Sequence, residues 1–477
     1  MFSRLLKNLA RRLGRPVSIL LAWALLAASL ASCALVPLLE EPTSSMSSPG
    51  ELRPDASPLP ENAECRSVAD YLVFWGFPSF DENKLLAIEK AYERYFYRSL
   101  PDVYTHASDL YDSFRFFASN GMDTSDPEFV TGAVILLYQR TAGDKYAVYM
   151  NKEETSSYKA EMDANFVGIG VHLSYNFEEN RCVVVSTMEG SSAREAGILP
   201  GDLLVAVGDL SIEKNAYNAL VQEISGEVGT TVTVTFERNG EATEYTLVRR
   251  ALSPVSVRCR RLVADPSVAI IEINQFTHKT AEEFIAIMDT LAADDISGIV
   301  FDVRDNPGGD VSSLATILDY LIPDGGAIAH FRHREGSEFE DQNFTIFAED
   351  GHSVDLPLAV MCNQNTASAG ELFTAALQDY GMATVVGKTT YGKATAQTSL
   401  EFTDGTMFTV SIYTCDPPKR PCYEGIGITP DIDVSLSPEA AKIPSQLRDD
   451  GDDAQLQAAV SALSSLNPLS AERTSHE

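Results

Sequence analysis

Between Asp81 and Tyr138 the apolar residues recur every three or four positions, which is the spacing of one face of an α-helix. Three helical stretches follow from this pattern, one from Asp81 onwards and two over residues 108–118 and 127–138. The pattern therefore predicts a helical region over residues 66–160.

Over residues 161–252 the pattern changes to short apolar runs bounded by glycine and polar residues, which is typical of strands. The three clearest runs lie at residues 182–186, 203–207 and 232–236. This stretch is expected to form a small β-rich domain.

Strand-like and helix-like stretches then alternate over residues 253–437, which indicates an α/β domain. Thr280 and Glu283 have the spacing of a capping box and predict the start of a helix. Residues 438–477 are acidic and polar, with helical periodicity at 454–466, and are expected to form an acidic C-terminal tail outside the α/β domain. The fold class predicted for the whole chain is multidomain α+β.

The first residues of the chain indicate export. Residues 1–15 carry five basic side chains and no acidic one, an apolar run covers 17–30, and the sequence Leu-Ala-Ser-Cys ends at Cys33. This order predicts a signal peptide over residues 1–32. Its ending resembles a bacterial lipobox, which implies cleavage before Cys33 and a lipid on the Cys33 sulfur. An uncleaved anchor is the alternative, although the run is short for a membrane-spanning helix.

Both alternatives place the protein in the bacterial cell envelope, held at the membrane. Residues 33–65 are rich in proline, serine and glutamate and lack apolar periodicity. They are predicted to be a flexible tether between the membrane and the folded domains.

Charge and cysteine content narrow the classes of partner. The chain has 68 acidic and 36 basic residues and a net charge of −32, whereas proteins that bind nucleic acid usually carry basic patches. No Cys-x-x-Cys or His-Glu-x-x-His pattern occurs, so no metal site or other cofactor is expected. Cys415 and Cys422 flank a short proline-rich loop and could close a disulfide after export; the sequence leaves this pairing open.

The candidate chemistry lies at Ser368, between an apolar run at 356–361, expected to be a buried strand, and a stretch of helical composition at 371–377. Backbone N–H groups at the start of a helix favour an anion, such as the oxyanion formed in acyl transfer. A serine needs a base to become nucleophilic. Lys393 follows 25 residues later and can be that base if burial lowers its pKa.

Three segments around these residues are similar to motifs of the S41 peptidases, the C-terminal processing or tail-specific proteases. They are Ser-Ala-Gly-Glu from Ser368, Gly-Lys-Ala-Thr-Ala-Gln ending at Gln397, and Asp-Val-Arg-Asp-Asn-Pro-Gly-Gly ending at Gly309. The resemblance implies that Ser368 is the nucleophile, Lys393 the general base and Gln397 the residue that orients the lysine.

The same resemblance implies an oxyanion hole built from backbone N–H groups. Ala369 would supply one of them, and Gly308 or Gly309 the other. Asp310 stands where the family usually has an apolar residue, and a carboxylate near Lys393 would favour the charged amine.

Residues 192–202 resemble the short helix and following turn of a PDZ domain. The residues that match the PDZ loop for a peptide carboxylate are Gly168, Ile169, Gly170 and Val171. The resemblances together imply an exported, lipid-anchored serine endopeptidase that cleaves proteins near their free C-termini. The rival hypothesis is a catalytically silent PDZ lipoprotein that binds such tails without cutting them.

Histidines offer a second candidate base. His278, His330, His333 and His352 could serve a Ser-His-Asp triad, but the chain contains no Gly-x-Ser-x-Gly elbow. Surface or loop positions are therefore expected for these four side chains.

Overall fold

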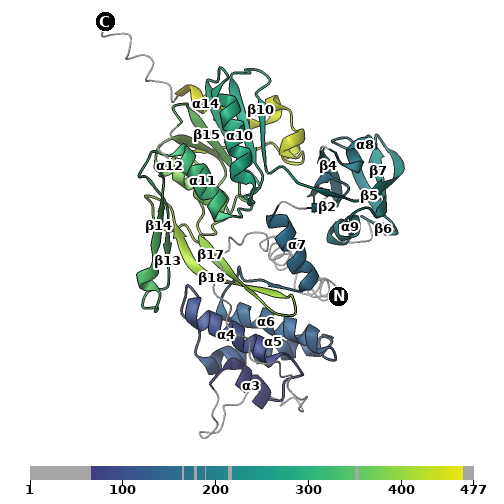
Figure 1. Ribbon diagram of the computed structural model, residues 1–477, viewed down its shortest axis with the longest axis vertical. Helices are drawn as coiled ribbons and strands as arrows, with labels where there is room; N and C mark the ends of the chain where they lie inside the picture. The colour runs from purple at the N-terminus through teal and green to yellow at the C-terminus, as the bar shows by residue number, and fades with distance from the viewer. Residues whose placement is uncertain are drawn as a thin grey trace.

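The computed structural model describes residues 66–163, 166–176, 180–188, 190–212, 217–349 and 354–465. The predicted signal peptide with Cys33, the tether and His352 lie outside this part of the chain. No helix within the described part has the length and apolar character needed to cross a membrane. Figure 1 shows a helical region at one end, an α/β core at the other and a small β-rich domain to one side.

The helical region is held together by buried aromatic side chains and by aspartate caps. Its helices are α3 (Val68–Phe74), α4 (Glu82–Tyr95), α5 (Val103–Ser119) and α6 (Pro127–Ala142). Asp81, Asp102 and Asp126 each accept a backbone N–H from the first turn of the helix that they precede, as N-cap residues do. The three predicted helical stretches are confirmed, although α5 begins earlier than expected.

A five-stranded sheet connects the helical region to the core. Its strands are β1 (Tyr149–Met150), β13 (Ala327–Arg332), β14 (Phe344–Phe347), β17 (Thr395–Glu401) and β18 (Met407–Asp416), in the order β1-β18-β13-β14 with β17 also paired to β18. Phe408 and Val410 of β18 pack into the aromatic core of the helical region, whereas Cys415 belongs to the core of the α/β domain. Strand β18 therefore joins the two parts (Figure 1).

The β-rich domain follows helix α7 (Lys152–Met162). Its sheet has the order β3-β4-β5-β7-β8, from β3 (Val171–Asn176), β4 (Arg181–Thr187), β5 (Leu203–Val207), β7 (Thr231–Arg238) and β8 (Glu241–Val248), with β6 (Leu210–Ser211) paired to β5. Helices α8 (Ser192–Glu195) and α9 (Tyr217–Ile224) complete the domain. The chain enters and leaves it through β2 (Phe166–Gly168) and β9 (Arg250–Leu252), which pair antiparallel. All three predicted strands are confirmed.

The core is a six-stranded sheet with helices on both faces. Its order is β10-β11-β12-β15-β16-β19, from β10 (Val257–Arg261), β11 (Val268–Ile273), β12 (Gly298–Asp302), β15 (Leu358–Cys362), β16 (Ala383–Gly387) and β19 (Ile432–Asp433). Only β10 runs antiparallel to its neighbour among these pairs. Strands β11, β12 and β15 are buried at every position, as parallel strands covered on both faces are.

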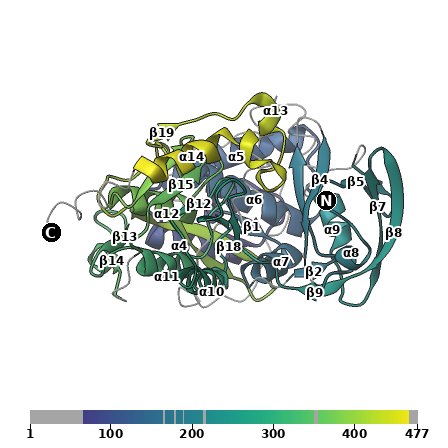
Figure 2. The same ribbon diagram turned by 90° about the horizontal axis from the view of Figure 1, so that it is seen from above.

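One face of this sheet carries α10 (Thr280–Ala292), α11 (Val311–Leu321) and α12 (Ala369–Asp379), and the other carries α14 (Ala454–Ser465). Figure 2 shows α14 and the short α13 (Pro438–Ala441) on the side opposite α10 and α11. The expected C-terminal tail is therefore wrong for this segment up to Ser465. Leu456, Ala459 and Leu463 are buried against Val300 and Met361 of the sheet, because without α14 an apolar sheet face would contact water.

The capping box predicted at Thr280 is also wrong. Helix α10 does begin there, but its N-cap is Lys279, which makes no side-chain cap. The Thr280 hydroxyl instead accepts the Thr277 N–H at 2.7 Å, and Glu283 accepts the Ser256 N–H at 2.8 Å. The Thr280 hydroxyl also lies 2.7 Å from the Ser256 hydroxyl, so both side chains join the helix to the segment before β10, a contact that local spacing does not reveal.

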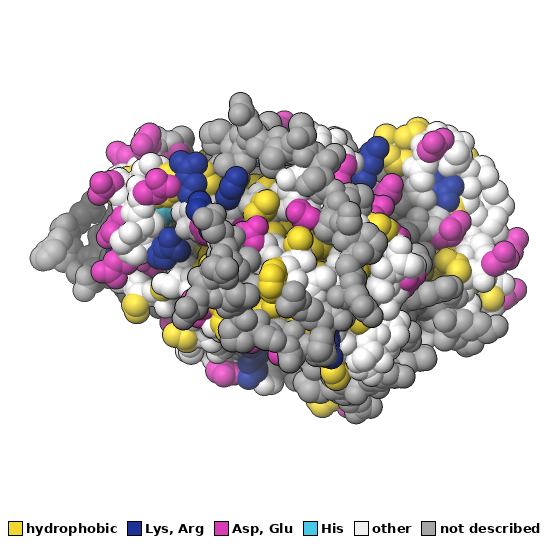
Figure 3. Space-filling model, turned by 90° about the horizontal axis from the view of Figure 1, so that it is seen from below, with side chains coloured by type: hydrophobic (Ala, Val, Ile, Leu, Met, Phe, Trp, Pro, Cys, Tyr) yellow, Lys and Arg dark blue, Asp and Glu magenta, His cyan; other side chains and the backbone are white. Residues whose placement is uncertain are grey.

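Cys415 and Cys422 are free thiols, and Cys415 is buried in the core. The disulfide that the sequence left open is therefore not formed in this structure. On the face shown in Figure 3, acidic side chains are spread over both ends of the molecule, in keeping with the net charge of −32.

Candidate active site

Ser368 lies at the junction of β15 and α12, where the sequence predicts a strand followed by a helix. Its backbone has φ 53° and ψ −118°, a conformation that costs free energy for any residue with a Cβ. Two hydrogen bonds hold the turn. The Ser368 N–H donates to Glu371 Oε2 at 2.9 Å, and the Ala367 N–H donates to the Asn306 carbonyl oxygen at 2.9 Å. The strained serine is only partly buried, as a residue that must meet a substrate should be.

Gly308 of the 302–309 loop lies directly against this turn, while its neighbour Gly309 lies against the backbone of Phe276. A Cβ on Gly308 would meet the Ser368 Cβ at 2.8 Å and the Ala369 nitrogen at 2.9 Å, so the close approach requires glycine. The Gly308 N–H already donates to Asn306 Oδ1 at 2.7 Å. Gly309 is therefore the better candidate to act with the Ala369 N–H as an oxyanion donor.

Lys393 and Ser368 line one small cavity. Its other walls come from α11, α12, β17, β18 and the loop after β18, through Val311, Ala369, Leu372, Thr395, Ala396, Cys415 and Tyr423. The Lys393 side chain is buried, and its Nζ lies 5.0 Å from the centroid of the Tyr146 ring.

Burial lowers the pKa of Lys393 to about 8, although the carboxylates of Asp144 and Glu424 act in the opposite direction. An amine with this pKa is partly neutral near pH 7 to 8. It can therefore accept a proton from a neighbouring hydroxyl.

One buried carboxylate connects the serine turn to the lysine loop. Glu371 is fully buried and accepts four hydrogen bonds. Its Oε1 accepts from the Thr390 hydroxyl at 2.5 Å and the Gly392 N–H at 2.6 Å, and its Oε2 accepts from the N–H groups of Ser368 at 2.9 Å and Lys393 at 2.8 Å. Burial raises the pKa of Glu371 to about 7, while these donors favour the ionised form. The sequence identifies Glu371 only as part of a motif. It does not reveal that this side chain connects the serine turn to the lysine loop.

Gln397 lies on β17 and is buried. Its Nε2 donates to the hydroxyl oxygens of Thr395 and Ser411, each at 3.1 Å. The Ser411 hydroxyl in turn donates to Asp144 Oδ1 at 2.8 Å, and Asp144 has the largest electrostatic effect on Lys393. The hydrogen bonds thus connect Gln397 to the surroundings of the lysine through Ser411 and Asp144.

Asp144 is a residue of the site that sequence reasoning missed. It follows α6 of the helical region, is 1% exposed, and burial raises the pKa of its carboxyl. The only sequence signal for it is the segment Gly-Asp-Lys-Tyr at 143–146, which also contains Tyr146. More than 200 residues of chain separate this segment from Lys393, so local patterns do not bring them together.

Asp310 and the described histidines do not line the cavity. Asp310 Oδ2 accepts the Ser313 N–H at 2.6 Å and so caps α11, which corrects the expectation that its carboxylate acts on Lys393. His278 Nδ1 lies 3.0 Å from Asp163, and His330 Nδ1 lies 2.8 Å from the Thr345 hydroxyl. The His333 ring lies 4.4 Å from the Tyr413 ring, tilted by 46°.

The four residues matched to a PDZ carboxylate loop form the turn between β2 and β3. Gly168 ends β2 and Val171 begins β3. The Ile169 side chain is buried in the core of the β-rich domain. Gly170 has φ 78°, and a Cβ there would meet the Ser191 Cβ at 2.2 Å, so this turn also depends on glycine.

Comparisons with known proteins assign both domains. Residues 267–434 match the family model of peptidase family S41, and residues 183–238 match that of a PDZ domain. The chain contains an S41 peptidase domain and a PDZ domain. The predicted fold class, with a helical region, a PDZ domain and a peptidase core, is confirmed.

Curated relatives are described as serine proteases. A "Probable CtpA-like serine protease" of Staphylococcus saprophyticus is 31% identical over 312 residues, which are 65% of this chain and 61% of that protein. A protein of the same description from Staphylococcus aureus is 30% identical over 291 residues, which are 61% of this chain and 57% of that protein. The chain thus spans about three fifths of the length of these relatives.

A solved structure shares the S41 fold. The structure of a putative S41 protease from Bacteroides fragilis has a TM-score of 0.52 to this chain at 14% sequence identity. The similarity covers 77% of this chain and 99% of that one, so the fold extends beyond the segment that the family model matches.

Replacing Glu371 by glutamine should destabilise the S41 domain by at least about 2 kcal/mol, since each buried donor left without an acceptor costs about 1–3 kcal/mol. Each Glu371 oxygen accepts from two donors. Whichever oxygen becomes the amide nitrogen, two donors therefore lose their acceptor. Urea unfolding of the parent and the variant measures the difference.

Glu283→Gln is the matched control. Glu283 accepts three hydrogen bonds from Ser256 and Val257, but all three reach its Oε2, so the remaining oxygen of glutamine can keep them. Equal losses of unfolding free energy in the two variants would show that the four hydrogen bonds at Glu371 stabilise the fold no more than the three at Glu283.

Proposed function

We propose that this protein is a serine endopeptidase in which Ser368 is the nucleophile and Lys393 the general base. The observation that carries the proposal is their shared cavity, which joins a strained serine to a buried lysine whose pKa is about 8. Membership of the core in family S41 and the serine protease relatives support the same reaction class.

The reaction follows from the positions of these groups. Neutral Lys393 takes the hydroxyl proton as Ser368 Oγ attacks the carbonyl carbon of the peptide bond. The oxyanion of the tetrahedral intermediate accepts hydrogen bonds from the N–H groups of Ala369 and Gly309. The charged lysine then gives its proton to the leaving amine, and an acyl ester forms on Ser368. Water, deprotonated by Lys393, hydrolyses this ester and restores the serine hydroxyl.

The carboxylates around the lysine assist the proton transfer. Attack by Ser368 creates a positive charge on Lys393, and Asp144 and Glu424 favour that charge. Gln397 would hold this arrangement through Ser411, whose hydroxyl connects it to Asp144. We therefore assign Gln397 an orienting role and not a direct one.

We further propose that the PDZ domain binds the free C-terminus of the substrate. Strand β3 lies at the edge of its sheet, where a peptide can add as a further strand. The glycine turn at residues 168–170 immediately precedes β3, which is where PDZ domains hold a terminal carboxylate. The substrates would be proteins cleaved near their C-termini.

The second candidate, a silent PDZ protein, shares this binding site but needs no working lysine. Retention of Ser368 and Lys393 in one cavity favours the enzyme. The predicted signal peptide, whose ending at Cys33 resembles a lipobox, supports a proposed location in the bacterial cell envelope, with a lipid on the cysteine as the membrane anchor. The two candidates have the same location and differ only in cleavage.

Cleavage should depend on Ser368 and on the neutral form of Lys393. Ser368→Ala should abolish it. For the parent, kcat/KM should rise about tenfold per pH unit below about pH 8 and level off above, because only the neutral amine is a base. Lys393→Arg cannot lose its charge and should lose about 10²–10⁴-fold or more.

Lys388→Arg is the matched control for this lysine. Lys388 lies in the same loop but is paired with Asp433, and its replacement should leave the rate and the pH profile unchanged. Cleavage of a peptide substrate, followed by mass spectrometry, measures all four proteins. An active Lys393→Arg enzyme would exclude the serine–lysine mechanism.

Amidation of a peptide substrate's C-terminus should slow its cleavage, because the carboxylate that the PDZ turn would hold is lost. In a Gly170→Val variant, whose side chain meets Ser191, free and amidated peptides should be cleaved at the same, slower rate. Competition between the two peptides measures the ratio. A parent enzyme that does not distinguish them would remove the PDZ domain from substrate selection.

Cys33→Ala should release the protein from the membrane fraction of cells that express the full chain, since the proposed lipid is attached to this one sulfur. Immunoblots of membrane and soluble fractions after a high-salt wash measure the distribution. Cys65→Ser is the control and should stay with the membrane. A Cys33→Ala protein that still sediments with membranes would contradict lipid attachment.

A further inference from the structure

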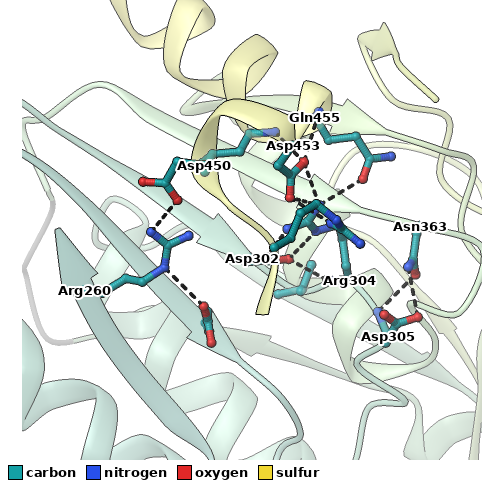
Figure 4. A network of polar contacts seen from close by, with 12 residues as sticks. Arg260, Asp302, Arg304, Asp305, Asn363, Asp450, Asp453 and Gln455 are labelled. Carbon is teal, nitrogen blue, oxygen red and sulfur yellow. Dashed lines mark hydrogen bonds and ion pairs between the residues drawn. The ribbon is translucent and has the colours of Figure 1, made fainter. Parts of the chain in front are cut away.

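A buried guanidinium lies in the oxyanion loop (residues 302–309), and the peptidase mechanism does not use it. The Arg304 side chain is 4% exposed and lies between two carboxylates from distant parts of the chain (Figure 4). Asp302 accepts from Nε at 2.9 Å and from Nη2 at 2.6 Å. Asp453 accepts from Nη1 at 3.1 and 2.8 Å, and Gln455 Oε1 accepts from the same nitrogen at 3.1 Å.

Asp453 and Gln455 belong to the C-terminal clamp, which we define as residues 448–457. Asp453 accepts the N–H groups of Gln455 and Leu456 at the start of α14 and also pairs with Arg448 at 2.9 Å. Two carboxylates, Asp302 and Asp453, therefore face two guanidinium groups in a buried, balanced cluster. Burial alone would raise the pKa of Asp453, but Arg304 holds it below its usual range.

The backbone that follows Arg304 leads directly to the candidate oxyanion donor. Asp305 has φ 59°, which needs support from its surroundings in a non-glycine residue. Its carboxylate accepts from Asn363 at 2.9 Å and Asn365 at 2.7 Å, in the turn before Ser368. Asn306 then bonds the Ile273 carbonyl oxygen at 2.7 Å.

Arg304 fixes the beginning of the oxyanion loop, which the contacts of Asp305 and Asn306 do not reach. Asp305 and Asn306 tie the loop to the nucleophile turn and to β11, while Arg304 ties its beginning to the clamp. A shift of Arg304 would be transmitted through the strained Asp305 toward Gly308 and Gly309. Oxyanion donors must be placed to within a few tenths of an ångström to be effective.

We propose that the C-terminal clamp positions the oxyanion loop, with Asp453 and Gln455 acting through Arg304 as positioning residues. The proposal rests on the proposed peptidase function and deepens it. It extends the functional unit beyond residue 434, where the S41 family match ends.

Asp453→Asn is the central variant. Asparagine retains an oxygen that can cap α14 but loses the charge that faces Arg304. We expect kcat to fall at least tenfold while KM changes less than twofold, because the interaction supports the transition state and not substrate binding. Labelling of Ser368 by a fluorophosphonate probe should slow in parallel, and thermal unfolding should report a folded protein.

Asp450→Asn is the matched control. Asp450 belongs to the same clamp but pairs with Arg260 on β10 at 2.8 Å and accepts the Val263 N–H at 3.0 Å, away from the oxyanion loop (Figure 4). It should keep the parental kcat. The double variant Asp453→Asn with Gln455→Glu puts a carboxylate back beside Arg304 but loses the bond from Gln455 Nε2 to the Val434 carbonyl oxygen at 2.9 Å, and it should recover part of the lost kcat.

Hydrogen exchange gives a measure that needs no activity. The amides of residues 305–309 should exchange faster in Asp453→Asn than in Asp450→Asn or the parent, and the double variant should restore part of their protection. If the parent shows no Ser368-dependent cleavage, the proposed function fails, and these exchange rates alone then decide whether the clamp holds the loop. Parental kcat and exchange in Asp453→Asn, or equal losses in both single variants, would overturn the proposal.

Discussion

The candidate site depends on a buried carboxylate that holds two separate turns together. Glu371 follows Ser368 by one helical turn, yet half of its hydrogen bonds come from the backbone of Gly392 and Lys393. Burying this group without partners would cost several kcal/mol. Four donors offset that cost only when the serine turn and the lysine loop lie side by side, so the carboxylate makes their association part of the fold's stability.

The lysine is adjusted by groups from beyond the S41 match. Burial lowers its pKa, Asp144 limits the decrease, and Tyr146 lies with its ring 5.0 Å from the Nζ. Both residues come from the end of the helical region, and Asp144 is in turn held by Ser411 of β18. The helical region thus contributes to the electrostatics of the site, and β18, which packs against both parts, sets their relative position.

The core sheet explains why the chain continues past its last strand. Its central strands are apolar on both faces, and α10, α11 and α12 cover only one of them. Helix α14 covers the other, and its first residues bring Asp453 to Arg304 at the end of β12. The segment formed by Asp453 and α14 therefore does two things: it buries the apolar face of the sheet, and it supplies a carboxylate to the buried guanidinium of Arg304.

The sequence by itself determined the local elements and pointed to Ser368 and Lys393 as the candidate reacting pair. Helix α6 follows from periodicity, because the spacing of its apolar residues is a property of the helix itself. The resemblance of the segments around Ser368 and Lys393 to the S41 motifs implied a shared site, and only helix α12 and strand β16 separate the two residues along the chain. The sequence could not decide whether Gly308 or Gly309 is the candidate oxyanion donor, because that choice depends on one hydrogen bond from the Gly308 N–H to Asn306.

Only the tertiary structure decided the remaining features. It placed Asp144 close enough to Lys393 to act on its pKa and packed α14 on the sheet, where the sequence predicts a tail. Each of these depends on contacts between residues or elements whose partner the local pattern does not specify. Periodicity and motif spacing report only on the helix or strand to which a residue belongs. The burial of a side chain, its charge partners and its pKa depend on all the elements that pack around it.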